Sequence, residues 1–116
     1  MLYTYNMKDE FVSKWQSQVK KGTLSFIVLN ILKGNSYYGY EIIEEIKANT
    51  QIQIAEGTLY PLMNRLKNEE LVKSKWVEQD SGIPRKYYEL TEKGVDISNQ
   101  MKKYWSDLSS SIEKIL

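Results

Sequence analysis

The sequence contains no cysteine and no histidine among its 116 residues. Without cysteine there is no disulfide, no thiolate metal site and no cysteine nucleophile. Without histidine, the usual general base and the commonest transition-metal ligand are also missing. We therefore expect no enzyme, no metal and no cofactor, because only a carboxylate pair or a lysine or tyrosine base is left and no acidic cluster is separate from ordinary helix surface.

Long apolar runs are also missing, and no stretch approaches the roughly 18 residues that a membrane span needs. The N-terminal segment MLYTYNMKDEF has neither the basic leader nor the apolar stretch of a signal peptide, so we expect a cytoplasmic protein. Charge of one sign does not dominate, since 16 basic and 15 acidic residues are interspersed and leave a net charge of +1. Any nucleic-acid surface must therefore be local.

Apolar spacing predicts three helices before any long strand. The first runs from about Lys8 to Lys33, and its second half, LSFIVLNIL, is apolar nearly all round and should lie in the middle of the fold. Ser36 can cap a second helix that ends near Asn49, and residues 51–54 form a short β-rich patch. The predicted inward residues of the second and third helices are Gly39, Ile42, Ile43, Ile46, Leu59, Leu62, Met63 and Leu66.

Two alternating segments follow, at residues 71–79 and 86–90, separated by the turn residues Asp80-Ser81-Gly82-Ile83-Pro84. They predict a β-hairpin. Thr91 can then cap a final helix that runs to the C-terminus. The predicted fold is mainly α with a β-hairpin wing: a winged helix-turn-helix with an N-terminal helical extension over residues 1–90, and a long C-terminal dimerisation helix over residues 91–116.

The side of the third helix opposite its apolar stripe carries little bulk and no net charge. Such a face can approach a major groove closely and read base edges through amide groups, while Thr58, Tyr60 and Arg65 flank it within reach of phosphates. A plain solvated face is the alternative interpretation. The residues of this outward face are Gly57, Pro61, Asn64 and Asn68.

The hairpin turn is followed immediately by Arg85 and Lys86. Two cations at a projecting turn can contact the minor-groove edge or its phosphates, as the wing of a DNA-binding domain does. Ordinary edge-strand charges are the alternative.

Several motifs in the same order and spacing resemble the PadR family of transcriptional regulators, over roughly residues 22–94. They are Tyr38-Gly39-Tyr40-Glu41-Ile42, Gly57-Thr58-Leu59-Tyr60-Pro61-Leu62 with Arg65-Leu66, Arg85-Lys86-Tyr87-Tyr88, Leu90-Thr91 and Gly94. The short final helix is similar to the compact branch of the family. The chain departs from a typical compact member in its N-terminal extension through about Trp15 and in the few cations on its outward face.

The resemblance implies a dimeric repressor whose third helices enter successive major grooves of a pseudo-palindromic operator, with the wings on the flanking backbone. It assigns DNA contacts to Tyr38, Gly57, Thr58, Tyr60, Arg65, Arg85 and Lys86, to which the position of Asn64 adds a base-reading amide. Tyr40 and one of Tyr87 and Tyr88 are instead expected in the core, since neighbouring strand residues point to opposite faces. A winged-helix module that binds protein rather than DNA is the alternative function.

The final helix carries an apolar stripe with the spacing of a coiled-coil seam: Ile97, Met101, Trp105, Leu108, Ile112 and Ile115. A lone helix cannot cover that stripe, so we expect a homodimer in which Phe11 and Trp15 supply a matching apolar surface, with intramolecular core packing as the alternative. The large indole of Trp105 in an otherwise aliphatic seam further suggests a pocket for a small planar aromatic effector, also lined by Met101, Leu108 and Phe11 or Trp15 of the other subunit. Ordinary interface packing is the alternative there.

Overall fold

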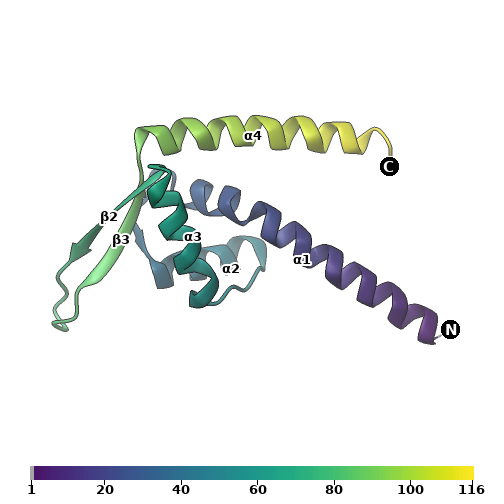
Figure 1. The fold of residues 1–116 in the computed structure, drawn as a ribbon, viewed down its shortest axis with the longest axis horizontal. Coiled ribbons are helices and arrows are strands. Elements are labelled where there is room, and N and C mark those ends of the chain that lie inside the picture. The colour runs from purple at the N-terminus through teal and green to yellow at the C-terminus, as the bar shows by residue number, and fades with distance from the viewer. Residues whose placement is uncertain (1) are drawn as a thin grey trace.

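In the computed structural model, the apolar second half of α1 (Leu2–Leu32) forms one side of the hydrophobic core. Figure 1 shows how the other helices and the strands are arranged relative to α1. The structure describes the backbone of residues 2–116 and the side chains of residues 9–116. In chain order the other elements are β1 (Tyr37–Tyr38), α2 (Gly39–Thr50), α3 (Glu56–Asn68), β2 (Val72–Val77), β3 (Arg85–Leu90) and α4 (Glu92–Glu113). Helices dominate and one hairpin projects, so the predicted class, mainly α with a β-hairpin wing, is confirmed.

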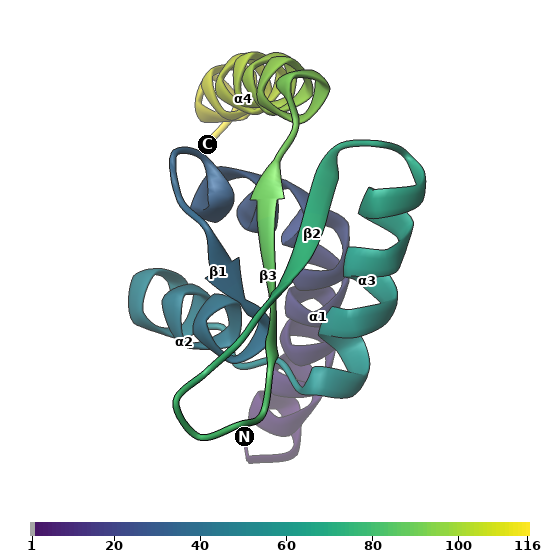
Figure 2. The ribbon, with the colours of Figure 1, turned by 90° about the vertical axis from the view of Figure 1, so that its left-hand side faces the viewer.

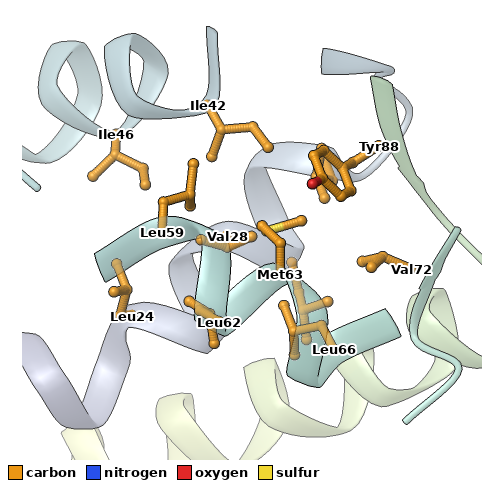
Figure 3. Packing of buried hydrophobic residues seen from close by; sticks show 12 residues of the cluster. Leu24, Val28, Ile42, Ile46, Leu59, Leu62, Met63, Leu66, Val72 and Tyr88 are labelled. Carbon is orange, nitrogen blue, oxygen red and sulfur yellow. The ribbon is translucent and has the colours of Figure 1, made fainter. Parts of the chain in front are cut away.

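The hydrophobic core forms where α1, α2 and α3 face one another, as Figure 3 shows. Its members from α2 and α3 are residues that helical spacing predicted to point inward, since a helix turns about 100° per residue and brings positions i, i+3, i+4 and i+7 to one side. Val72 and Tyr88 add the sheet side of the core. The buried apolar residues are Leu24, Val28, Leu29, Leu32, Ile42, Ile46, Leu59, Leu62, Met63, Leu66, Val72 and Tyr88.

The three strands form one antiparallel sheet with β3 in the middle (Figure 2). Strands β2 and β3 are the predicted hairpin, which we call the wing, and Trp76 lies opposite Lys86 in its register. On the other edge of β3, the two residues of β1 pair with the two hairpin tyrosines: Tyr37 with Tyr88, and Tyr38 with Tyr87.

Two local predictions on either side of α2 are wrong. Residues 51–54 form no strand, because Gln51 adopts a positive φ of 65° and its N–H donates to the Lys47 carbonyl, which ends α2 in a left-handed cap. At the other end, the N-cap of α2 is Tyr38 instead of Ser36, and the Tyr38 N–H donates to the Glu41 carboxylate at 3.2 Å. The segment before α2 therefore belongs to the sheet, as β1.

Helices α1 and α4 both continue beyond the core and diverge from each other (Figure 1). Helix α1 begins at Leu2, earlier than the predicted Lys8. Thr91 caps α4 as predicted, since its hydroxyl accepts a hydrogen bond from the Gly94 N–H at 2.9 Å. The apolar stripe of α4 is half-buried at Ile97 and Met101 but exposed at Trp105, Leu108 and Ile112, and Ile115 follows the last helical residue.

Candidate nucleic-acid interface

Helix α3 presents its polar side to solvent because its apolar side is buried in the core. Leu59, Leu62, Met63 and Leu66 are buried, whereas all four residues predicted on the outward face are exposed: Gly57, Pro61, Asn64 and Asn68. A β-carbon at Gly57 would meet no atom within 4 Å, so another molecule can approach the backbone closely at this point. The N-cap residue, Ala55, makes no side-chain hydrogen bond to the first turn, and Glu56 places an acidic side chain in that turn.

A groove of about 490 Å³ lies between this face of α3, the start of α2 and the wing. We call it the wing groove. It brings together five of the eight candidate DNA-binding residues, from three separate parts of the chain. The lining residues are Tyr38, Gly39, Tyr60, Asn64, Trp76, Pro84, Arg85, Lys86 and Tyr88.

The floor of the wing groove depends on a close contact between Tyr60 and Gly39. A β-carbon at position 39 would lie 2.5 Å from the Tyr60 hydroxyl oxygen and 2.9 Å from the nearest ring carbons. Only glycine therefore lets the first turn of α2 approach the ring this closely. The contact holds Tyr60 at the junction of α2 and α3 while leaving part of its side chain exposed.

The two wing cations are held by aromatic rings on opposite faces of β3. The Arg85 guanidinium lies 4.4 Å from the centroid of the Tyr38 ring, which in turn makes an edge contact with Tyr87 at 5.5 Å. The Lys86 ammonium lies 5.9 Å from the Trp76 centroid and 5.7 Å from the Tyr88 centroid. Stacking of this kind restricts long side chains without neutralising them.

Neither Arg85 nor Lys86 has a carboxylate within salt-bridge distance among the residues whose side chains are described. Elsewhere on the wing, by contrast, Lys73 is paired with Glu89 at 3.4 Å. The positive charge at the wing groove is therefore free to attract an anion, and its effect is strongest at low ionic strength.

The other candidate DNA-binding residues lie outside the wing groove. Thr58 and Arg65 line a smaller hollow on the opposite flank of α3, where they meet Lys21 of α1. Gly57 lies on the exposed face of α3 and lines neither the wing groove nor this smaller hollow. The candidate residues therefore form a surface across α3 with a cationic side chain at both flanks.

The prediction for Tyr40 is wrong. It was expected in the core, but 55% of its surface is exposed, because one step of 100° along α2 separates it from the buried Gly39. The nearby Glu44 carboxylate raises the pKa of the Tyr40 phenol. The prediction that one of Tyr87 and Tyr88 lies in the core is confirmed, because Tyr88 is buried and Tyr87 is half-buried. Burial raises the pKa of the Tyr88 phenol.

Four residues that line the wing groove are not among the predicted site residues: Gly39, Trp76, Pro84 and Tyr88. Among these four, the exposed aromatic residue is Trp76. Its place in an alternating strand indicated only that it belonged to the hairpin. A turn confined to residues 80–84 would align Trp76 with Tyr88, whereas the structure pairs Trp76 with Lys86, so only the observed register places it directly opposite that cation.

A second groove, of about 470 Å³, lies between α1 and α4, and we call it the α1–α4 groove. Four residues of the predicted apolar stripe line it: Ile97, Met101, Trp105 and Leu108. The Trp105 ring lies 5.8 Å from the ring of Phe26, with the planes inclined by 38°. Phe11, Trp15 and Ile112 do not line this groove, and all three are exposed on the diverging parts of α1 and α4.

Among the described residues, we find no helix that combines the length and the apolar character needed to span a bilayer. The model of the family described as transcriptional regulator PadR-like family matches residues 28–100. An uncharacterized protein of Lysinibacillus sphaericus is 32% identical over 100 residues, which cover 84% of this chain and 92% of that protein.

Two solved structures with similar folds carry the same family description. A PadR family transcriptional regulator from Eggerthella lenta is 34% identical, with a TM-score of 0.84, 94% of this chain covered and 95% of the other. A PadR-like transcriptional regulator from Bacillus cereus is 30% identical, with a TM-score of 0.76 and coverages of 84% and 95%.

Proposed function

The chain belongs to the PadR-like family of transcriptional regulators, and we propose that it is a dimeric repressor that binds a pseudo-palindromic operator through α3 and the wing. The observation that carries this proposal is the wing groove, where the unpaired cations Arg85 and Lys86 lie beside the exposed face of α3. A duplex offers a phosphate backbone for such cations and base edges for an exposed helix face.

In this proposal the wing-groove residues divide between affinity and specificity. Arg85, Lys86, Tyr38 and Tyr60 contact phosphates on one side of the inserted helix, and their contacts are independent of sequence. Asn64, in the middle of the exposed face, reads a base edge. Three further residues complete the contact surface. Thr58 and Arg65 contact phosphates from the other flank of α3, and Gly57 allows the DNA to approach the helix backbone closely.

Apolar side chains on α1 and α4 support a homodimer. Both helices leave the core with large exposed hydrophobic residues, which a second copy of the chain can cover through a two-fold axis. We assign the DNA-binding unit with its helical extension to residues 1–90 and the dimerisation helix to residues 91–116. The exposed side chains that support this interface are Phe11, Val12, Trp15, Val19, Trp105, Leu108 and Ile112.

We also propose that the repressor responds to a small planar aromatic effector bound at the α1–α4 groove. In support, the groove is lined by Phe26, Trp105 and Leu108, among other apolar groups. The Trp105 ring lies against the Phe26 ring and stays partly exposed. An effector that prefers one spacing of the two recognition helices changes operator affinity, and the operator must then change effector affinity by the same factor.

The test is a mobility-shift titration with DNA from the promoter of the chain's own gene, repeated over a series of salt concentrations. We expect one dimer per operator, tighter binding than to an unrelated duplex, and a steep loss of affinity as salt increases. Added protein should also lower transcription from that promoter in a purified system. Binding to neither duplex would contradict the proposal and favour a protein-binding module.

A further inference from the structure

Trp76 exposes 67% of its surface and lines the wing groove. Its partner in the β2–β3 register is Lys86, so both side chains lie on the same face of the wing. Tyr88, two residues farther along β3, lies on this face too and is buried in the core. The face that carries Trp76 is therefore the one that continues from the core toward α3.

Lys86 lies near both the Trp76 and the Tyr88 ring, and the surroundings of the two rings differ. Its ammonium is 5.7 Å from the centroid of the buried Tyr88 ring and 5.9 Å from the centroid of the exposed Trp76 ring. Tyr88 needs no further partner because the core covers it. The indole, in contrast, has an apolar surface open to solvent beside an unpaired cation.

We propose that Trp76 is a direct DNA contact that packs on the deoxyribose of one operator strand, while Lys86 binds the neighbouring phosphate. This inference rests on the proposed function and adds a residue to it. A DNA strand alternates apolar sugar faces with anionic phosphates, and the adjacent indole and ammonium match that alternation. Asn64 on α3 and Arg85 on β3 line the same groove as Trp76, and both contact the duplex in the proposed complex.

The contact is with the backbone, so it contributes affinity without sequence preference. It also has a positioning component, because removing the indole frees the Lys86 ammonium on its exposed side. These two properties distinguish Trp76 from a base-reading residue and from an aromatic residue that only stabilises the hairpin.

The first experiment follows Trp76 directly in a protein that carries Trp15→Phe and Trp105→Phe and retains only this tryptophan. Saturation with the operator duplex should reduce acrylamide quenching of Trp76 by at least half. The matched control carries Trp15→Phe and Trp76→Phe, and retains only Trp105 on α4. Its quenching should not change with DNA.

The second experiment compares Trp76→Ala and Trp76→Phe in mobility shifts. We expect Trp76→Ala to weaken binding about tenfold, equally on operator and unrelated duplex, and Trp76→Phe to retain most of the affinity. Because the indole is exposed, both variants should unfold at nearly the wild-type temperature. Unchanged stability with reduced affinity excludes a purely structural role.

The results separate this inference from the proposed function. If the wild-type protein binds the duplex while Trp76 stays fully quenchable and Trp76→Ala binds as tightly as wild type, the inference is overturned and the proposed function stands. A loss on the operator alone also overturns it, since that marks a base contact. If the wild type binds no duplex, the proposed function fails as well.

Discussion

The α-carbon of Gly94, in the first turn of α4, packs directly against the backbone carbonyl of Leu71, where α3 ends and the wing begins. Hydrogen bonds reinforce the contact: the Thr91 N–H donates to the Leu71 carbonyl at 3.1 Å and the Thr91 hydroxyl donates to the Glu70 carbonyl at 2.6 Å. Lys93 donates to the Glu69 carbonyl at 3.1 Å. Hydrogen bonds and close packing thus connect the start of the proposed dimerisation helix to the segment that directly follows the proposed recognition helix.

Replacing Gly94 by alanine should destabilise the protein by about 1–3 kcal/mol, because the methyl group would overlap the Leu71 carbonyl and the backbone would have to move. The matched control is Gly22→Ala in α1, where a β-carbon meets nothing within 4 Å. That variant should gain about 0.5–1 kcal/mol from helix propensity. Urea unfolding at equal protein concentration measures both, and a gain in stability at position 94 would contradict the close packing.

Replacing Arg85 and Lys86 together by alanine should weaken binding to every duplex and flatten the dependence of log affinity on log salt by about two phosphate contacts per protomer. The rings that hold these cations remain, so stability should change little. The control removes two exposed cations from α4, Lys102→Ala with Lys103→Ala, and should leave the slope unchanged. An unaltered slope in the first variant would exclude the wing from the interface.

Asn64→Ala should lower affinity for the operator by about 1–3 kcal/mol and affinity for unrelated DNA much less, because a lost base contact affects only the matching sequence. Asn68 is one turn farther along the same exposed face and outside the wing groove. Asn68→Ala should therefore have the smaller effect. Competition mobility shifts measure the ratio, and equal losses on both duplexes would identify Asn64 as a backbone contact or a bystander.

Leu108→Asp should shift the protein from dimer to monomer in sedimentation velocity, because it places a charge in the exposed apolar stripe that the second copy is proposed to cover. Ser110→Asp adds the same charge on the opposite side of α4, where the residue is exposed to solvent. It should remain dimeric. A dimeric Leu108→Asp variant would place the interface elsewhere.

Planar aromatic compounds that bind the α1–α4 groove should quench the fluorescence of the protein that retains only Trp105. The protein that retains only Trp76 should respond to DNA and not to these compounds. Operator binding should then alter compound affinity by the same factor by which the compound alters operator affinity. If no compound quenches Trp105 in a protein that still binds DNA, the effector proposal is wrong.

Much of this fold follows from local patterns. The apolar stripes of α2 and α3, the wing, and the Thr91 cap were all predicted, because helical and strand periodicity decide which residues a single element buries. The exposed face of α3 followed from the same periodicity. The motifs that resemble the PadR family contain six of the residues that line the wing groove: Tyr38, Gly39, Tyr60, Arg85, Lys86 and Tyr88.

The tertiary structure decided the features that depend on partners distant in sequence. Strand β1 has two residues and forms because Tyr37 and Tyr38 meet the free edge of β3, about fifty positions later in the chain. The patch at residues 51–54 has the composition of a strand but pairs with none of the three strands and is a loop. The proximity of Trp76 to Asn64 and the packing of Gly94 on Leu71 arise in the same way, since contacts between elements depend on how those elements pack and not on the pattern within either one.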